Sequence, residues 1–344
     1  GGAAAVGITY WFAMAVERPF GITTHLRLLE LSAPDEIIMR RMQAEAPGTY
    51  THSVMVAQLA EAAAKEVGAD PLLCRVGGLY HDIGKLRRPH CFVENQAGEN
   101  VHDRLSPQMS ALLIVAHVKD GVELGRALRL PQPVLDIIAQ HHGTTLISYF
   151  YHRATQIARE KQAARDDATA PRADDVADSS LADNAPSVLL SETDEALFRY
   201  PGPKPQSREA AIVLLADTVE ASSRALPNVT PELLMAHIKK MTEQRLQDGE
   251  LSECELTLRD LQKIEQVFAH VLRGVLHHRI EYPDPSREEA RDWTHHALSD
   301  PLVPERLSEH EMRAAAKRSA ELRRAGEPRK AERPLSGAKV RAAT

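Results

Sequence analysis

The sequence predicts an all-α fold, and three observations indicate it. Aromatic residues make up only 4% of the chain, whereas small and aliphatic residues are abundant, a balance that suits helices packed on helices better than a β-sandwich. Apolar segments with helical spacing are bounded by capping residues, prolines and glycines. No segment shows the strict alternation of a β-strand, and no internal repeat is present. With 344 residues, 43% of them hydrophobic, the chain can bury a substantial core in one large or two ordinary domains.

Charge and cysteine content exclude several classes of protein. The formal net charge of −6 gives no electrostatic reason to expect a stable DNA or RNA partner. Cys74, Cys91 and Cys254 are scattered and lack CxxC spacing. They indicate a reducing compartment and argue against a disulfide framework or a thiolate zinc site.

Residues 1–33 are expected to be the end of a truncated transmembrane helix followed by a linker. Ala3 to Val16 carry no charge, but a run of about 14 residues is too short to cross a bilayer, which needs roughly 20. Because the sequence starts at Gly1, we expect it to be part of a longer protein, with Tyr10 and Trp11 near the membrane interface. The alternative is a buried helix.

Residues 34–280 are expected to form the main domain. Thr51 to Val67 is predicted to be one helix ended by Gly68, and Pro71 to Tyr80 the next. Residues 87–107 are loop-like, and Ser106-Pro107 then begins a helix that Asp120-Gly121 is expected to stop. Another helix runs from Leu130-Pro131 through Gln140.

The later part of the chain divides by composition. Residues 160–196 are rich in Ala, Asp, Ser and Pro without an apolar period, which predicts a mobile acidic insertion. Helices are predicted at 210–224, 231–247 and 256–278. Residues 281–344 are expected to be a basic, largely disordered tail, with ten Lys or Arg against four Glu from residue 311 onward.

Five histidines and two aspartates on these helices carry the candidate chemistry. His81-Asp82 follows a helix, and His141-His142 closes another. His117 and Asp217 lie in otherwise apolar helices, where an imidazole or a carboxylate needs a partner to offset its desolvation. Taken singly, each has an ordinary explanation: a hydrogen-bonded core histidine, an aspartate paired with arginine, or a solvated helix end. Together they predict a metal centre formed by His52, His81, Asp82, His117, His141, His142 and Asp217.

The donor set indicates two metal ions rather than one. Imidazole with carboxylate suits Fe, Mn, Co or Zn better than calcium, and seven ligands exceed the three that one catalytic zinc uses. Two divalent ions sharing one carboxylate would activate a water and neutralise charge on a phosphate group. Lys85, one helical turn after His81-Asp82, is a candidate catalytic and phosphate-binding residue, with a solvent-facing helix end as the alternative.

Longer segments around these residues resemble the HD domain of the seven-transmembrane HD family of cyclic-di-AMP phosphodiesterases. The similarity extends from Glu17 to His278, and the segments are APGTYTHS, GGLYHDIGK, FVENQ, HDRLSP, HVKDG, QHHGTTLISYFY, FRYPGPKPQSREAAI and LADTVEASSR. The resemblance implies an all-helical HD-domain bundle with a dinuclear iron or manganese site. It also implies hydrolysis of cyclic di-AMP to linear pApA, by a domain on the cytoplasmic side of a bacterial inner membrane. By the same resemblance, His52, His81, Asp82 and Asp217 would hold one ion, and Asp82, His117, His141 and His142 the other. Asp82 would then bridge the two ions, which makes it a candidate catalytic residue.

Other assignments rest on weaker signals. His102, Tyr149 and Tyr151 are candidate substrate-binding residues, with loop stabilisation and core packing as the alternatives. Competing functions are an HD-type hydrolase of cyclic di-GMP, dNTP or ppGpp, and a nucleotide-sensing HD receptor domain without activity. GTTLISYFY after His141-His142 lacks the HHExxDGxGYP pattern of the cyclic-di-GMP enzymes. The sequence leaves the native metal, the oligomeric state and the sensed signal open.

Overall fold

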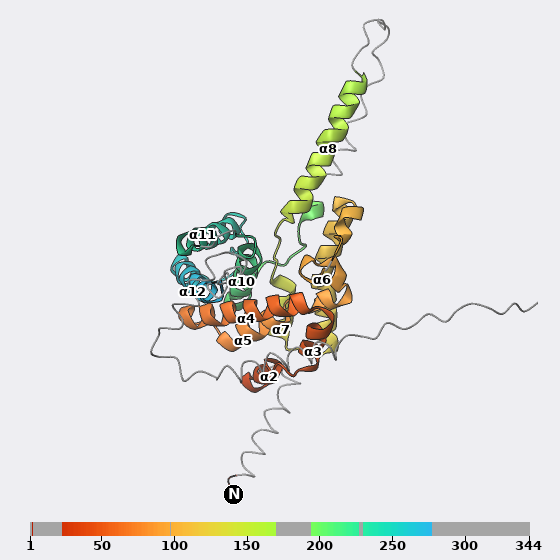
Figure 1. Cartoon of the computed structure of the whole chain (residues 1–344). Coiled ribbons are helices and arrows are strands. Elements are labelled where there is room, and N and C mark those ends of the chain that lie inside the picture. Colours follow the sequence, from red (N-terminus) through yellow and green to blue (C-terminus); the bar gives the residue numbers. More distant parts are fainter. Residues whose placement is uncertain (1, 3–22, 97, 170–193, 227–229, 277–344) are drawn as a thin grey trace, which may run out of the picture. The chain divides into compact units, whose positions relative to one another are not determined.

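The protein is all-helical in the computed structural model, which describes residues 2, 23–96, 98–169, 194–226 and 230–276 (Figure 1). Within these residues the sole β-type contact is one isolated bridge between Leu146 and Arg199. None of the described helices is both long and apolar enough to cross a membrane. The predicted apolar segment at 3–16 and the tail at 281–344 lie outside the described residues.

Most of the helices follow one another with short connections. The first half contains α2 (His25–Leu31), α3 (Ile37–Glu45), α4 (Pro47–Val67), α5 (Pro71–Tyr80), α6 (Pro107–Ala127) and α7 (Gln132–Gln140). The second half contains α8 (Ser148–Thr169), α10 (Arg208–Ser223), α11 (Pro231–Gln247) and α12 (Leu258–Leu276). Among the described residues, four short 3-10 helices lie between α5 and α6: η1 (Ile83–Arg87), η2 (Pro89–Cys91), η3 (Val93–Asn95) and η4 (Val101–Arg104). A fifth, η5 (Glu195–Phe198), precedes α10.

Local sequence signals explain where these helices begin and end. The Asp70 carboxylate accepts hydrogen bonds from the first backbone amides of α5, and the Ser106 hydroxyl does the same for α6. Gly68 ends α4 with φ of 72°, a conformation that glycine adopts without steric cost. The predicted boundaries of α4, α5, α7, α10, α11 and α12 agree with the structure to within a few residues at most ends.

Helix α4 is central, because it contributes to two hydrophobic cores. Its Val56, Leu59 and Ala60 pack with α10, α11 and α12, while Ala57 joins a second core with α2, α3, α5 and α7 (Figure 1). Leu28 and Leu31 of α2 are buried in this second core. The folded region therefore starts before residue 34, the boundary that we predicted.

The prediction that Asp120-Gly121 stops a helix is wrong. Helix α6 continues through Gly121 to Ala127, and glycine serves close packing there. Its backbone lies against Gly84 of η1: a Cβ atom on Gly84 would be 1.9 Å from the His117 carbonyl oxygen and 2.4 Å from the Gly121 nitrogen. Glycine at 84 thus lets η1 approach α6 at the level of His117.

The predicted acidic insertion also begins later than expected. Helix α8 continues to Thr169, so its last ten residues occupy positions that we expected to lack structure. Phe150 and Ala154 anchor the start of α8 against Ala111 of α6 and Phe198 of η5. Residues 170–193 of the predicted insertion lie outside the described residues.

Candidate metal centre and adjoining pocket

His52 and His81 meet because α4 and α5 pack closely. A Cβ atom on Gly78 of α5 would lie 2.6 Å from the Ala57 Cα of α4, so glycine is required for this approach. Five residues before Ala57 on α4, His52 faces His81, which caps the C-terminus of α5, and their Nε2 atoms are 3.2 Å apart. The Asp82 Oδ2 atom lies 3.2 Å from His81 Nε2 and 3.5 Å from His52 Nε2.

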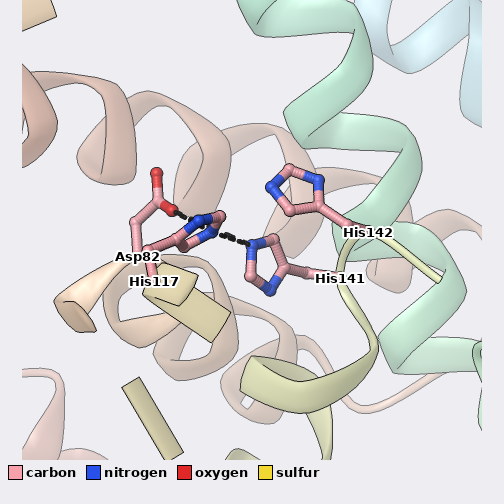
Figure 2. A group of neighbouring side chains, drawn as sticks. All are labelled: Asp82, His117, His141 and His142. Atoms are coloured by element: carbon pink, nitrogen blue, oxygen red, sulfur yellow. Dashed lines mark hydrogen bonds and ion pairs between the residues drawn. The ribbon is translucent and has the colours of Figure 1, made fainter. Parts of the chain in front are cut away.

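The other oxygen of Asp82 faces histidines from α6 and α7. His117 Nε2 is 3.3 Å from Asp82 Oδ1, and His141 Nε2 is 3.8 Å from the same atom. His117 Nε2 and His141 Nε2 are 3.2 Å apart, and the His142 ring lies beside both (Figure 2). Asp82 therefore stands between two groups of histidines, one on each carboxylate oxygen.

Asp217 of α10 completes the cluster. Its Oδ1 atom is 3.0 Å from His52 Nε2, and its Oδ2 atom is 3.5 Å from His142 Nδ1. The structure thus brings together all seven residues that the sequence singled out as candidate metal ligands. Six of them are less than 9% exposed, and His142 is partly exposed.

The cluster consists of hydrogen-bond acceptors that face one another. Nδ1–H of His81, His117 and His141 donates to the backbone carbonyl three residues earlier, at Gly78, Ile114 and Ile138 respectively. These bonds assign the tautomer, so each Nε2 presents a lone pair to the centre of the cluster. The buried Asp82 Oδ1 has no hydrogen-bond donor among the described residues.

A divalent cation satisfies these acceptors. Ligand atoms about 2.1 Å from one ion are separated by roughly 3–3.5 Å, close to the separations between Asp82 and the histidines around it. Neutral imidazole and carboxylate are the donors that first-row transition metals prefer. Buried acceptors that face one another without a donor or a cation are energetically unfavourable. The arrangement is therefore consistent with divalent metal binding.

The ionisation of the side chains leads to the same conclusion. Burial lowers the pKa of His141 to about 3 and also lowers those of His117 and His142, so these rings are neutral ligands at neutral pH. Burial favours the protonated form of Asp82, but Lys85 and His81 outweigh it and hold its pKa well below the usual range. For His52, burial is outweighed by hydrogen bonds to Asp217 and Glu220, which raise its pKa to about 10. Without a metal, a proton on His52 balances the carboxylates, and a cation would displace that proton.

A pocket of about 250 Å³ opens beside the cluster. His52, His117, His142 and Asp217 form its polar floor. Its walls are formed by Lys85, Phe92, Val93, Glu94, Ile114, Tyr200, Glu220, Ala221 and Arg224. The pocket therefore offers both apolar surface and cationic groups beside the candidate metal centre.

Lys85 is a cation of this pocket whose side chain is 13% exposed. Its Nζ donates to Glu94 Oε1 at 2.8 Å and lies 2.7 Å from Asp82 Oδ2. Burial would lower the pKa of Lys85, but Asp82 and Glu94 outweigh it and raise the pKa, which keeps the ammonium charged. The ammonium also lies 4.9 Å from the centre of the Phe92 ring. Lys85 is thus the only one of the predicted substrate-binding residues that lines the pocket.

The other predicted substrate-binding residues lie elsewhere. His102 is buried beside Phe150, and its Nε2–H donates to the Cys91 carbonyl. Tyr149 is 65% exposed, and Tyr151 contacts Phe198 in the core of α6, α8 and η5. None of the three lines the pocket.

Tyr200, rather than Tyr149 or Tyr151, is a tyrosine that lines the pocket. Its ring stacks on His142 with centroids 4.2 Å apart, and it lines the pocket. Burial raises its pKa, so the phenol stays protonated. Sequence reasoning missed Tyr200, although it lies inside the FRYPGPKP segment.

Glu220 was also missed by the sequence analysis. Its Oε2 accepts a hydrogen bond from His52 Nδ1–H at 2.6 Å. A buried acid three residues after Asp217, on the same face of an apolar helix, was a signal that could have identified it.

Comparison with known proteins agrees with this architecture. Residues 49–222 match the HD domain family. Over 273 residues, the chain is 42% identical to the cyclic-di-AMP phosphodiesterase PgpH of Bacillus subtilis, and the aligned region covers 79% of this chain and 34% of the relative. The chain is 41% identical over 269 residues to the cyclic-di-AMP phosphodiesterase PgpH of Listeria monocytogenes, and that alignment covers 78% of this chain and 33% of the relative. The chain thus spans about a third of the length of these curated relatives.

A solved structure shows the same fold. The crystal structure of the Listeria monocytogenes PgpH HD domain in complex with cyclic-di-AMP is 38% identical and superposes with a TM-score of 0.58. The match covers 71% of this chain and 99% of that domain.

Proposed function

Because this chain belongs to the HD domain family, we propose that it is the catalytic domain of a phosphodiesterase that hydrolyses cyclic di-AMP to linear pApA. The single observation that carries the proposal is the convergence of seven buried or partly buried acceptor residues, Asp82 among them, beside a pocket with a charged lysine. Two curated relatives with 41–42% identity bear this activity in their names, and the related HD domain was solved with cyclic-di-AMP.

The proposed metal ligands divide into two sets that share Asp82. His52, His81, Asp82 and Asp217 would hold one divalent ion, and Asp82, His117, His141 and His142 the second, with iron or manganese as the metals that this donor set favours. Such a pair supplies a nucleophile from water at neutral pH and neutralises charge on phosphate oxygens. The distances of 3.2–3.5 Å from Asp82 to His52, His81 and His117 support this division.

In the proposed reaction, a water oxygen bonds to phosphorus while the bond from phosphorus to the 3′ oxygen breaks. The 3′ oxygen leaves with a proton as a hydroxyl group, and the new phosphate stays on the 5′ carbon. Lys85 would donate hydrogen bonds to a non-bridging phosphate oxygen, since its ammonium is charged and directed at the cluster by Asp82 and Glu94. Phe92 and Tyr200 would give an adenine apolar surface to contact within the pocket.

We also propose that the complete protein is attached to the bacterial inner membrane, with this domain on the cytoplasmic side. The support is the uncharged run from Ala3 to Val16, which lies outside the described residues. The other proposed partner is the cyclic dinucleotide itself.

Metal analysis combined with a product assay tests the function. We expect about two metal ions per chain and conversion of cyclic di-AMP to pApA, with much slower hydrolysis of cyclic di-GMP. Asp82→Ala should lower turnover by at least about 100-fold while circular dichroism shows a folded protein, because Asp82 belongs to both proposed sets of ligands. A metal-loaded wild-type protein that leaves cyclic di-AMP intact, or that cleaves another nucleotide faster, would refute the proposal.

A further inference from the structure

His52 is held differently from the other buried histidines of the cluster. The rings of His81, His117 and His141 are each oriented by a backbone carbonyl of the same helical turn. The Nδ1–H of His52 instead donates to a carboxylate, Glu220 Oε2, which comes from a different helix. The ring of His52 is therefore fixed by tertiary packing of α4 against α10.

One face of α10 carries the groups that hold this ring. Asp217, Glu220 and Arg224 follow one another at spacings of three and four residues, which places them in one row along a helix. Asp217 Oδ1 lies 3.0 Å from Nε2 of His52, and Glu220 Oε2 lies 2.6 Å from Nδ1. Helix α10 thus contacts both nitrogens of a single imidazole ring.

Arg224 in turn fixes Glu220. Its Nε donates to Glu220 Oε1 at 2.8 Å, and a second guanidinium nitrogen donates to the same oxygen. The two oxygens of Glu220 therefore have separate partners, Arg224 on one and His52 on the other. Glu220 is 4% exposed, and these partners offset the desolvation of its carboxylate.

We propose that Glu220, braced by Arg224, is a positioning residue that orients His52 and strengthens it as a metal ligand. The inference rests on the metal centre of the proposed function. A carboxylate that accepts the Nδ1–H bond fixes the ring and makes the Nε2 lone pair more basic than a backbone carbonyl does. Glu220 does not itself join the cluster, because it contacts the opposite nitrogen of the ring.

The experiment measures Mn²⁺ affinity in the absence of nucleotide. Removing a residue of this kind weakens metal binding by about 10–100-fold. We expect Glu220→Ala to weaken one Mn²⁺ site by about 100-fold and Glu220→Gln by about 10-fold, since the amide oxygen still accepts the Nδ1–H bond. The second site, which lacks His52, should keep wild-type affinity.

Two further variants separate positioning from a purely structural ion pair. Glu265→Gln is the matched control, because Glu265 is also a buried glutamate, 8% exposed, but lies on α12 and does not line the pocket. It should bind Mn²⁺ like the wild type at both sites. Arg224→Met changes a half-exposed side chain, so it should fold even if the Glu220 variants do not, and it should weaken the His52 site several-fold.

This inference and the proposed function are tested by different measurements. Wild-type Mn²⁺ affinity at both sites in Glu220→Ala and Arg224→Met would overturn the positioning role, as would equal weakening in Glu265→Gln. In the zinc-loaded protein, the Nδ1–H proton resonance of His52 should move upfield in Glu220→Gln, and an unchanged resonance also counts against the inference. Failure to hydrolyse cyclic di-AMP would refute the function alone, because no readout here uses substrate.

Discussion

Replacement of Gly84 by alanine tests whether backbone packing sets the geometry of the metal centre. A Cβ atom at this position would lie 1.9 Å from the His117 carbonyl oxygen, whereas contacts under 3.0 Å are essentially never found. The two backbones must therefore separate by at least 3.0 − 1.9 = 1.1 Å. No flexible side chain is available to move aside, since both nearest groups are backbone atoms.

This displacement would change the separation of two proposed metal ligands, Asp82 and His117. Asp82 lies just before η1, and the clashing carbonyl belongs to His117 itself, whose Nε2 is 3.3 Å from Asp82 Oδ1. A misplacement of about 1 Å in a catalytic arrangement costs about 100-fold in rate, and overpacking costs about 1–3 kcal/mol of stability. We expect Gly84→Ala to lose about 100-fold in cyclic-di-AMP hydrolysis and about 3 kcal/mol in the free energy of unfolding.

Initial rates, metal content after dialysis and urea unfolding measure these effects. The matched control is Gly98→Ala, because an added Cβ there meets nothing within 4 Å. It should match the wild type in all three measurements. Wild-type rate and metal content in Gly84→Ala would show that the close approach of η1 and α6 does not set the site.

Two more predictions concern the metals directly. His117→Ala should empty mainly the site shared by Asp82, His141 and His142, because His117 contacts Asp82 Oδ1 rather than Oδ2; metal analysis showing equal loss from both sites would contradict the division of ligands. Chelation of the wild type should lower the melting temperature reversibly, since an ion at 100 times its Kd contributes about 2.7 kcal/mol; an unchanged melting curve in calorimetry after verified metal removal would argue against a cation linking these helices.

The sequence predicted which histidines and aspartates converge better than it predicted which residues line the pocket. Histidines and aspartates in apolar helices conflict with their surroundings, so the local pattern around each one already indicates that it needs a partner. Phe92 and Tyr200 give no such signal, because an aromatic residue in a buried segment has the same pattern whether it packs in a core or lines a pocket. Tyr151 was therefore a reasonable candidate, yet it contacts Phe198 in the core.

Helix ends were predicted where capping groups act locally and were missed where tertiary packing decides. Ser106 and Gly68 act within one turn of their own helix, and both signals were interpreted correctly. Gly121 has the composition of a helix stop, but it lies inside α6, where it packs against Ile138 of α7 and Gly84 of η1. A sequence pattern within α6 alone does not contain that information.

The hydrogen bonds from His81, His117 and His141 to backbone carbonyls have a consequence for how the centre assembles. Each of these rings is directed by the turn of helix that carries it, so its orientation exists as soon as that turn forms. The partner that orients His52 lies on α10, so we expect the half of the centre around His52 to form later during folding, once α10 has docked. An ion captured early would therefore enter beside His117 and His141, and docking of α10 would complete the other coordination shell.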